Sequence, residues 1–502
     1  MLYCRPMSDN HPEEVPQVLP VSEPGPHASD SMQGDPIARP PEASLSPWGT
    51  TLCSILVAVL IGSLLRFSTA TPLDRLENPE GSLERLVTRE MDLRDALRRV
   101  PAWERMLHLV LSGEEDTLND SIAWYDELSG AVESPVVQLY RVILLGEAGQ
   151  ANRVITAIVP WEFRDEATAR MAGWVRAAYL QIPPAPETGQ KLLTEIREGL
   201  PSGWFADVLV ARVAAEIGDR NTQLEAESAI AARGETLLNR RRIVTVGEMV
   251  LLGLGGGMLW RILARRSDVR IGEALVPPGW TIQDGYGLFI RGALGFLVIS
   301  ALVPFLLPKE IFFVGVSTLA AGAPMLVWTV RYLAARGASV PKTFGFQPPV
   351  GGAVRLGSVT IVLIGLSLAG EAVIAVVGGA FHLKTHWADG LLEDLLWGPS
   401  WLAAGVALDS IVWAPIVEEI GFRGVLYATL RTRIKVGPAV LLSAAVFALV
   451  HGYGVMGFAS VFWSGALWAL AYERTRSLIP GVLAHAVNNL LVTGEFVWLV
   501  RM

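Results

Sequence analysis

The sequence predicts an all-α membrane protein, a polytopic helical bundle of about eight spans plus an N-terminal anchor, joined to a soluble helical domain. Hydrophobic residues make up 51% of its 502 residues and charged residues only 18%, and the mean hydropathy is +0.40. Beyond position 240, apolar residues gather in runs of about 20, the length that a helix needs to cross the hydrocarbon layer. Inside lipid, only helices and closed barrels satisfy every backbone polar group.

Composition also excludes some partners. The formal net charge of −8 leaves no basic stripe to meet a phosphate backbone, so no nucleic acid partner is expected. The two cysteines, Cys4 and Cys53, cannot form a disulfide framework or a cysteine metal cluster. The lipid bilayer itself is the first partner that this composition predicts.

Residues 1–47 predict a disordered tail, because proline and acidic residues dominate them and little apolar surface is available to bury. The first membrane candidate covers residues 48–65 and is closed by Arg66. We interpret residues 48–66 as a transmembrane anchor, since the apolar run is long for a signal peptide. The alternative is a cleaved signal that ends near Ala70.

Residues 73–240 are soluble in character and contain a weak internal repeat. Similar amphipathic stretches open at spacings of about 34 residues, the period of tetratricopeptide (TPR) arrays. The three stretches are Leu139–Arg141, Trp174–Arg176 and Val208–Val210, and Glu147–Asn152 recurs as Glu216–Asn221. The domain is either TPR-like, with a concave surface that suits a protein partner, or a helical bundle with a chance similarity.

The remaining apolar runs form membrane helices at 243–345 and a second membrane domain at 350–500. The candidate spans are residues 243–259, 292–307, 311–330, 356–381, 396–414 continuing as a helix to 430, 436–450, 454–472 and 479–500. Short loops carry arginine or lysine at 265–266, 336–342, 431–435 and 474–476. Because positive loops stay in the cytoplasm, all four are expected there, with residues 73–240 on the other side.

Two adjacent carboxylates, Glu418 and Glu419, lie inside this membrane region. Ionisable residues within a span are costly, so each one is a functional hypothesis. Glu419 and Arg423 are four residues apart on one helix face and can form an ion pair. Glu418 points roughly 100° away and has no local cation. Such a carboxylate, in a medium of low dielectric constant, suits a general base.

Two further polar pairs follow on later apolar runs. Phe447 and His451 end one run, and His485 and Asn489 share one face of the last run. If the spans that carry Glu418 and His451 form an antiparallel hairpin, these two residues lie at nearly the same depth. For His485 to meet them, the basic end of this hairpin must project beyond the membrane.

The motifs Glu-Glu-x-x-x-Arg, Phe-x-x-x-His and His-x-x-x-Asn, in this order on successive apolar segments, resemble those of the CPBP family. That family includes the type II CAAX prenyl endopeptidases and the bacteriocin-processing or immunity proteins called Abi. The resemblance covers about residues 350–500. It implies an intramembrane endopeptidase that acts on membrane-associated or lipidated, CAAX-like protein substrates, in the inner membrane of a bacterial cell.

The resemblance also implies a role for each motif residue. Glu418 would activate the attacking water with help from His451, while His485 and Asn489 would donate hydrogen bonds to the oxyanion of the tetrahedral intermediate. The residues that would support their geometry and charge are Glu419, Arg423 and Phe447.

The need for a metal stays open at this point. Family members are often described as metalloproteases, and Glu418, His451 and His485 supply donor types that zinc accepts. The chain nevertheless contains no His-Glu-x-x-His helix, and a glutamate base needs no metal. Either a single divalent metal such as zinc or no cofactor is expected.

Three other interpretations compete with the protease. One is a catalytically silent membrane scaffold, or a bacteriocin-immunity type of protein, that recruits partners through residues 73–240. Another is a transporter, since buried carboxylates and histidines also form proton relays, although the sequence lacks the paired repeats that are typical of transporters. The last is a polar cluster that only joins helices by hydrogen bonds.

Overall fold

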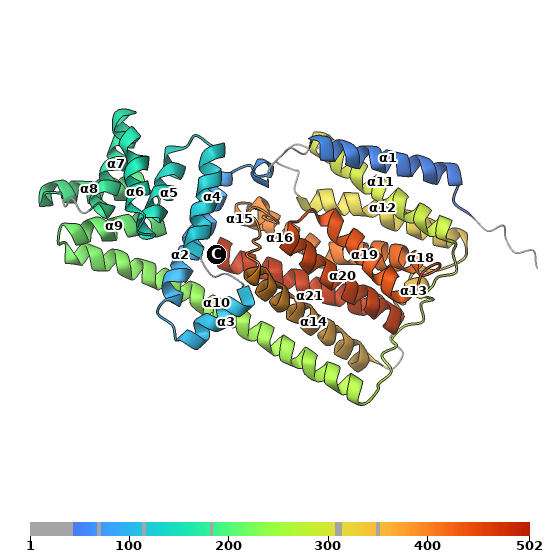
Figure 1. Cartoon of the computed structure of the whole chain (residues 1–502). Helices are drawn as coiled ribbons and strands as arrows, with labels where there is room; N and C mark the ends of the chain where they lie inside the picture. The colour runs from blue at the N-terminus through green and yellow to red at the C-terminus, as the bar shows by residue number, and fades with distance from the viewer. Residues whose placement is uncertain (1–43, 68–71, 113–116, 181–183, 307–313, 348–351) are drawn as a thin grey trace, which may run out of the picture. The chain divides into compact units, whose positions relative to one another are not determined.

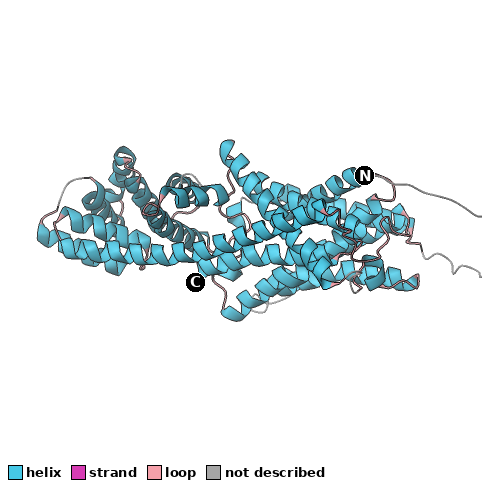
Figure 2. Ribbon diagram, turned by 90° about the horizontal axis from the view of Figure 1, so that it is seen from below, coloured by secondary structure: helices cyan, strands magenta, loops and turns pink. Residues whose placement is uncertain are grey.

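The computed structural model describes residues 44–67, 72–112, 117–180, 184–306, 314–347 and 352–502. Within these ranges every regular element is a helix and no strand is formed (Figures 1 and 2). The predicted all-α fold class is therefore confirmed. Most of the predicted tail at 1–47 and the alternative cleavage site near Ala70 lie outside the described residues.

Short helices joined by tight turns build the predicted soluble domain, which is called the soluble region here. They are η1 (Pro72–Arg75), α2 (Pro79–Leu97), α3 (Ala102–Ser112), α4 (Thr117–Ala131), α5 (Pro135–Glu147), α6 (Ala151–Ile158), η2 (Val159–Phe163), α7 (Glu166–Tyr179), α8 (Pro186–Gly199) and α9 (Trp204–Glu216). Their apolar faces share one core, in which the rings of Tyr140 and Phe205 stack with centroids 4.0 Å apart.

The two similar six-residue stretches adopt the same turn. Gly149 after α5 and Gly218 after α9 have φ angles of +70° and +77°, a left-handed conformation that glycine adopts without steric cost. After each glycine, the next amide donates to a carbonyl five residues back at 2.9 Å, which is a common way to end a helix. The stretches therefore repeat in structure as well as in sequence, while the TPR assignment stays a prediction.

Helix α10 (Arg220–Ala264) connects the soluble region to the membrane region without a break (Figure 1). Its 45 residues extend over about 68 Å at 1.5 Å per residue. It packs against α2 and α9, and against the membrane helix α14 (Ala353–Ala380). A Cβ atom on Gly255 would lie 2.8 Å from the Cα of Gly365 in α14, so glycine permits this close approach.

Six of the described helices are long and apolar enough to cross a membrane. They are α10, α11 (Ile282–Leu306), α14, the irregular helix Ser400–Leu430, α20 (Val455–Thr475), and α21 (Ile479–Phe496) with its extension η5 (Val497–Arg501). Other helices of this region are α1 (Pro47–Phe67), α12 (Val314–Ala335), α13 (Val340–Phe344), α15 (Glu393–Leu396) and α19 (Val436–His451). The chain is thus an integral, multi-pass membrane protein. Two predicted spans, 292–307 and 311–330, extend into residues outside the described ranges.

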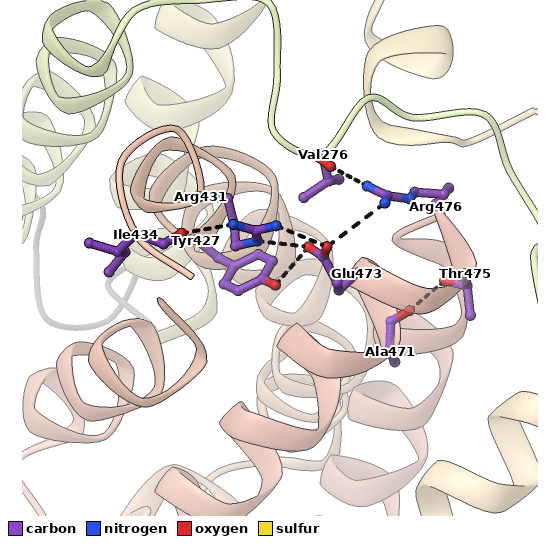
Figure 3. Close-up of polar contacts among 8 residues, drawn as sticks. All are labelled: Val276, Tyr427, Arg431, Ile434, Ala471, Glu473, Thr475 and Arg476. Carbon is purple, nitrogen blue, oxygen red and sulfur yellow. Dashed lines mark hydrogen bonds and ion pairs between the residues drawn. The ribbon is translucent and has the colours of Figure 1, made fainter. Parts of the chain in front are cut away.

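The predicted cytoplasmic loops meet at one end of the bundle. The amide of Ile271 donates to the carbonyl of Thr475 at 2.8 Å, and the amide of Leu478 donates to the carbonyl of Phe344 at 3.1 Å. Loop 431–435 lies at the same end, because Arg431 donates to Glu473, next to loop 474–476, in the polar cluster of Figure 3. The side of the membrane that this end faces stays a prediction.

The soluble helices contact the other end of the bundle, at the segment that follows α14. The amide of Asn78 donates to Glu393 Oε1 at 2.9 Å, and His386 Nε2 lies 2.9 Å from Glu127 Oε2 of α4. The basic loops and the soluble helices therefore lie at opposite ends of the membrane bundle, as the predicted topology requires.

Candidate active site

The adjacent glutamates lie in an irregular helix over residues 400–430. Its regular segments are α16 (Ser400–Leu408), α17 (Ala414–Glu418) and α18 (Ala428–Leu430), and its π-helical segments are η3 (Asp409–Trp413) and η4 (Glu419–Tyr427). Turns of π-helix are rare and occur frequently at functional sites. The second π segment begins at Glu419, so the winding of the backbone changes between the two carboxylates.

Glu419 and Arg423 form the predicted ion pair, which is thereby confirmed. Arg423 Nη1 donates to Glu419 Oε1 at 2.6 Å. The side chain of Arg423 is 1% exposed and that of Glu419 is 0% exposed. A buried pair of this kind is stable only while both partners are present, because the removal of one leaves an uncompensated charge.

The guanidinium of Arg423 lies between two aromatic rings. Its Cζ atom is 4.1 Å from the centroid of Phe447 on α19 and 5.0 Å from that of Trp468 on α20. Desolvated cation–π contacts contribute about 2 kcal/mol and partly offset the lost hydration of the cation. Gly465 provides the space, since a Cβ atom there would lie 3.0 Å from the Phe447 ring and 3.1 Å from Arg423 Nη2.

His485 of α21 lies between the two carboxylates. Its Nδ1 is 3.3 Å from Glu419 Oε1, and its Nε2 is 3.7 Å from Glu418 Oε2. The imidazole stacks on Trp468, with ring centroids 4.1 Å apart and an interplanar angle of 21°. One ring therefore links both glutamates, and Trp468 fixes the plane of that ring.

Glu418 is the accessible member of the glutamate pair. Its side chain is 28% exposed, whereas that of Glu419 is fully buried. Its Oε2 atom is buried and, like Glu419 Oε2, has no hydrogen-bond partner among the described residues. Arg423 and His485 hold Glu419 in place, and the Glu418 carboxylate keeps an oxygen free to accept a proton.

His451 ends α19, and its orientation is set by Phe447. The Nδ1 atom of His451 lies 2.7 Å from the Phe447 carbonyl oxygen. Because a carbonyl only accepts, this contact assigns a proton to Nδ1 and leaves the lone pair of a neutral ring on Nε2. The Phe447 ring is 4.7 Å from the His451 ring and 6.0 Å from the His485 ring, centroid to centroid. Phe447 thus lies beside the histidines of two motifs, His451 and His485.

Asn489 binds the backbone of the irregular helix. Its Nδ2 donates to the carbonyl of Ser410 at 2.8 Å. In η3 the amide of Ala414 donates to the carbonyl of Asp409, five residues earlier. By the same spacing, the carbonyl of Ser410 would accept from the amide of residue 415. Pro415 has no N–H, so the carbonyl of Ser410 lacks its backbone donor and Asn489 replaces it.

Residues 399–491 match the protein-family model described as type II CAAX prenyl endopeptidase Rce1-like. The chain carries an Rce1-like domain. This confirms the predicted resemblance to type II CAAX prenyl endopeptidases, and every motif residue lies within the matched segment. No curated protein and no solved structure matches the chain.

A second polar cluster holds the far end of the π segment in the Rce1-like domain (Figure 3). Tyr427 Oη donates to Glu473 Oε2 at 2.8 Å, and Arg431 Nε donates to the same oxygen at 3.1 Å. Arg476 Nη2 lies 3.8 Å from Glu473 Oε1. Glu473 of α20 therefore fixes the end of the segment that begins at Glu419.

A metal site in the Rce1-like domain would need several donor side chains that lie close together. Among the described residues, no group of three or more His, Cys, Asp or Glu side chains is placed to hold an ion. In this arrangement Glu418, His451 and His485 therefore do not form a three-residue ligand set.

Trp468 is the member of this site that the sequence analysis missed. It contacts both Arg423 and His485, yet an aromatic residue in an apolar helix carries no polar signal. The motif patterns contain only the ionisable residues, the amide and one phenylalanine. Trp468 lies on a third helix and packs against two motif residues. Such a contact depends on how the helices pack together, which the motif patterns do not contain.

Proposed function

We propose that the Rce1-like domain is an intramembrane endopeptidase that hydrolyses peptide bonds of membrane-associated or lipidated, CAAX-like protein substrates. The observation that carries this proposal is the unequal environment of two adjacent carboxylates. Glu419 is fully buried and bound by Arg423 and His485, whereas Glu418 is partly exposed and, among the described residues, no arginine binds it. A general base needs such a free carboxylate, held near the reacting water.

Charge balance supports a mobile proton at this site. With both glutamates ionised and Arg423 protonated, the buried cluster carries one net negative charge. Uncompensated charge is costly where water is scarce, so the cluster favours one further proton on Glu418 or His485. The nearest ionisable atoms of these two side chains are 3.7 Å apart, which a small movement or one water can bridge.

In the proposed reaction, ionised Glu418 takes a proton from water while the water oxygen attacks the carbonyl carbon of the scissile peptide bond. His451 orients this water through the lone pair on Nε2. The tetrahedral intermediate collapses when its C–N bond breaks, and the proton on Glu418 passes to the leaving nitrogen. The products are a new carboxyl group and a new amine.

His485 and Asn489 are proposed to stabilise the oxyanion of that intermediate. A doubly protonated His485 can donate from Nε2 while Nδ1 remains on Glu419. Asn489 uses one N–H on Ser410 and retains the other. A single donor to an oxyanion contributes a factor of about 10²–10³ to kcat.

A zinc-dependent mechanism is the alternative to the glutamate base. With purified protein, 1,10-phenanthroline separates the two. A glutamate-base enzyme keeps its activity in the chelator, whereas a zinc enzyme loses activity and recovers it when zinc is added.

We further propose that the protein lies in the bacterial inner membrane and that residues 73–240 offer a surface for a protein partner.

Membrane proteomes of cells that carry the wild type, Glu418→Gln or Glu371→Gln test the proposal as a whole. Glu371 is a matched control, because it is also a glutamate of a membrane helix but accepts a hydrogen bond from Ser460. The proposal expects an uncleaved precursor in Glu418→Gln cells only. If Glu418→Gln cells process the same proteins as wild-type cells, the silent scaffold is the better account.

A further inference from the structure

A cavity of about 1050 Å³ lies away from the glutamate pair, where α2, α3 and α10 meet the end of α21 and η5. Its lining combines an apolar part with a surplus of positive charge. The arginines are Arg89, Arg94, Arg98, Arg105 and Arg241, against the two glutamates Glu90 and Glu495. The apolar part includes Leu93, Leu97, Leu237, Val492, Phe496 and Leu499.

Two of these arginines have side chains without a bonded partner. Among the described residues, the side chains of Arg89 and Arg105 form neither a hydrogen bond nor an ion pair, whereas Arg241 is paired with Glu495. Arg89 is half-buried, and burial together with the neighbouring Arg85 lowers the pKa of its guanidinium, although the nearby Asp92 opposes this in part. A half-buried cation among other cations is destabilising until an anion approaches it.

The cavity lies at the level where the helices enter the membrane. Arg241 lies two residues before Ile243, which opens the apolar half of α10 and is 61% exposed. On the cavity wall, Val492 of α21 is 65% exposed. Helix α3 packs against α14 at this level and exposes Trp103, a residue type that is enriched at membrane–water interfaces.

We propose that this cavity binds the headgroup of an acidic glycerophospholipid, with its phosphate on Arg89 and Arg105 and its acyl chains along the wall that contains Val492. The planar guanidinium forms paired hydrogen bonds with phosphate oxygens. Basic pockets at the ends of membrane helices recognise acidic lipids by this chemistry. A free phosphate would satisfy the arginines but would leave the apolar part of the lining uncovered.

Lipid retention by the full-length protein, measured by native mass spectrometry in detergent, tests this proposal. Phosphatidylglycerol and phosphatidylcholine are the lipid probes, and inorganic phosphate is the probe for a free anion. The test variant is Arg89→Gln with Arg105→Gln. The matched control is Arg170→Gln with Arg220→Gln, which removes two arginines of the soluble region outside the cavity.

We expect the wild type to prefer phosphatidylglycerol, and the test variant to bind it about thirtyfold more weakly, since each arginine near an anionic headgroup contributes about a factor of five. The control should change this affinity by less than about twofold. Because neither arginine has a partner, the test variant should unfold at no lower temperature than the wild type. Equal binding of both lipids, an unchanged test variant, or displacement of the lipid by millimolar phosphate would each overturn the proposal.

Discussion

His485 Nδ1 lies 3.3 Å from Glu419 Oε1, the same carboxylate oxygen that Arg423 Nη1 contacts at 2.6 Å. Glu419 is therefore shared by an arginine and a histidine from two different helices, and its position depends on both. The other nitrogen of the same imidazole, Nε2, lies 3.7 Å from Glu418 Oε2. A displacement of Glu419 would thus be passed to Glu418 through His485.

The first prediction concerns the buried ion pair. Glu419→Gln leaves the Arg423 cation buried without the carboxylate that pairs with it directly, so the free energy of unfolding should fall by about 3–5 kcal/mol. Thermal unfolding of the purified protein measures this change. Glu371→Gln serves as the control and should cost less than about 1 kcal/mol, because glutamine can still accept from Ser460. A Glu419→Gln protein as stable as this control would contradict the assignment.

The second prediction concerns Asn489 and Pro415. Asn489→Ala leaves the carbonyl of Ser410 without a donor and should cost about 1–3 kcal/mol of stability. In a Pro415→Ala background the cost should be smaller, since the new amide can donate to that carbonyl. Unfolding of the two single variants and the double variant gives the coupling energy. Equal costs of Asn489→Ala in both backgrounds would show that Pro415 is not the reason why the Ser410 carbonyl lacks a backbone donor.

A third prediction concerns Gly465, which makes room for the stacked cation. Gly465→Ala places a methyl group 3.0 Å from the Phe447 ring and 3.1 Å from Arg423 Nη2. Overpacking of this kind should cost about 1–3 kcal/mol and lower the activity as well. Gly494→Ala is the matched control on α21, since no neighbouring atom lies within 4 Å of its added methyl group. Equal effects of the two alanines on stability would disprove the tight contact.

Much of the fold could be predicted because bilayer thickness sets the length of an apolar helix. The contact between Glu419 and Arg423 could be predicted because helix geometry alone places residues four apart on one face. Both inferences use only local information along the chain.

The rest of the site depends on packing between helices. His485 and Asn489 share a helix face, yet the first contacts Glu419 and the second contacts a backbone carbonyl. That carbonyl lacks a backbone donor because η3 is π-helical before Pro415, and no sequence pattern predicted the π-helix. The contact of His386 with Glu127 likewise depends on packing, because Glu127 belongs to a distant helix.

A fourth prediction concerns pH and the soluble region. Asp92 of α2 is fully buried, and burial raises its pKa to about 6, although the hydrogen bonds from Arg233 lower it. The folded state therefore binds this proton more tightly than the unfolded chain does. The associated stability is fully present below about pH 4 and is lost as pH rises through about 6, which amounts to roughly 3 kcal/mol.

Unfolding of the full-length wild type and Asp92→Asn between pH 4 and pH 7 tests this effect. Asparagine does not titrate, so the stability of the wild type relative to the variant should fall over this range. A difference that stays constant with pH would show that Asp92 titrates alike in both states.

The most direct test of the account is the rate at which purified Glu418→Gln protein in proteoliposomes cleaves a precursor identified by the proteome comparison. The comparison with the wild type is made at equal amounts of folded protein. Because Glu418 is the proposed general base and is not part of the buried ion pair, the variant should fold normally and cleave about 10²–10⁴-fold more slowly. A rate within about tenfold of the wild type would contradict the proposed role of Glu418.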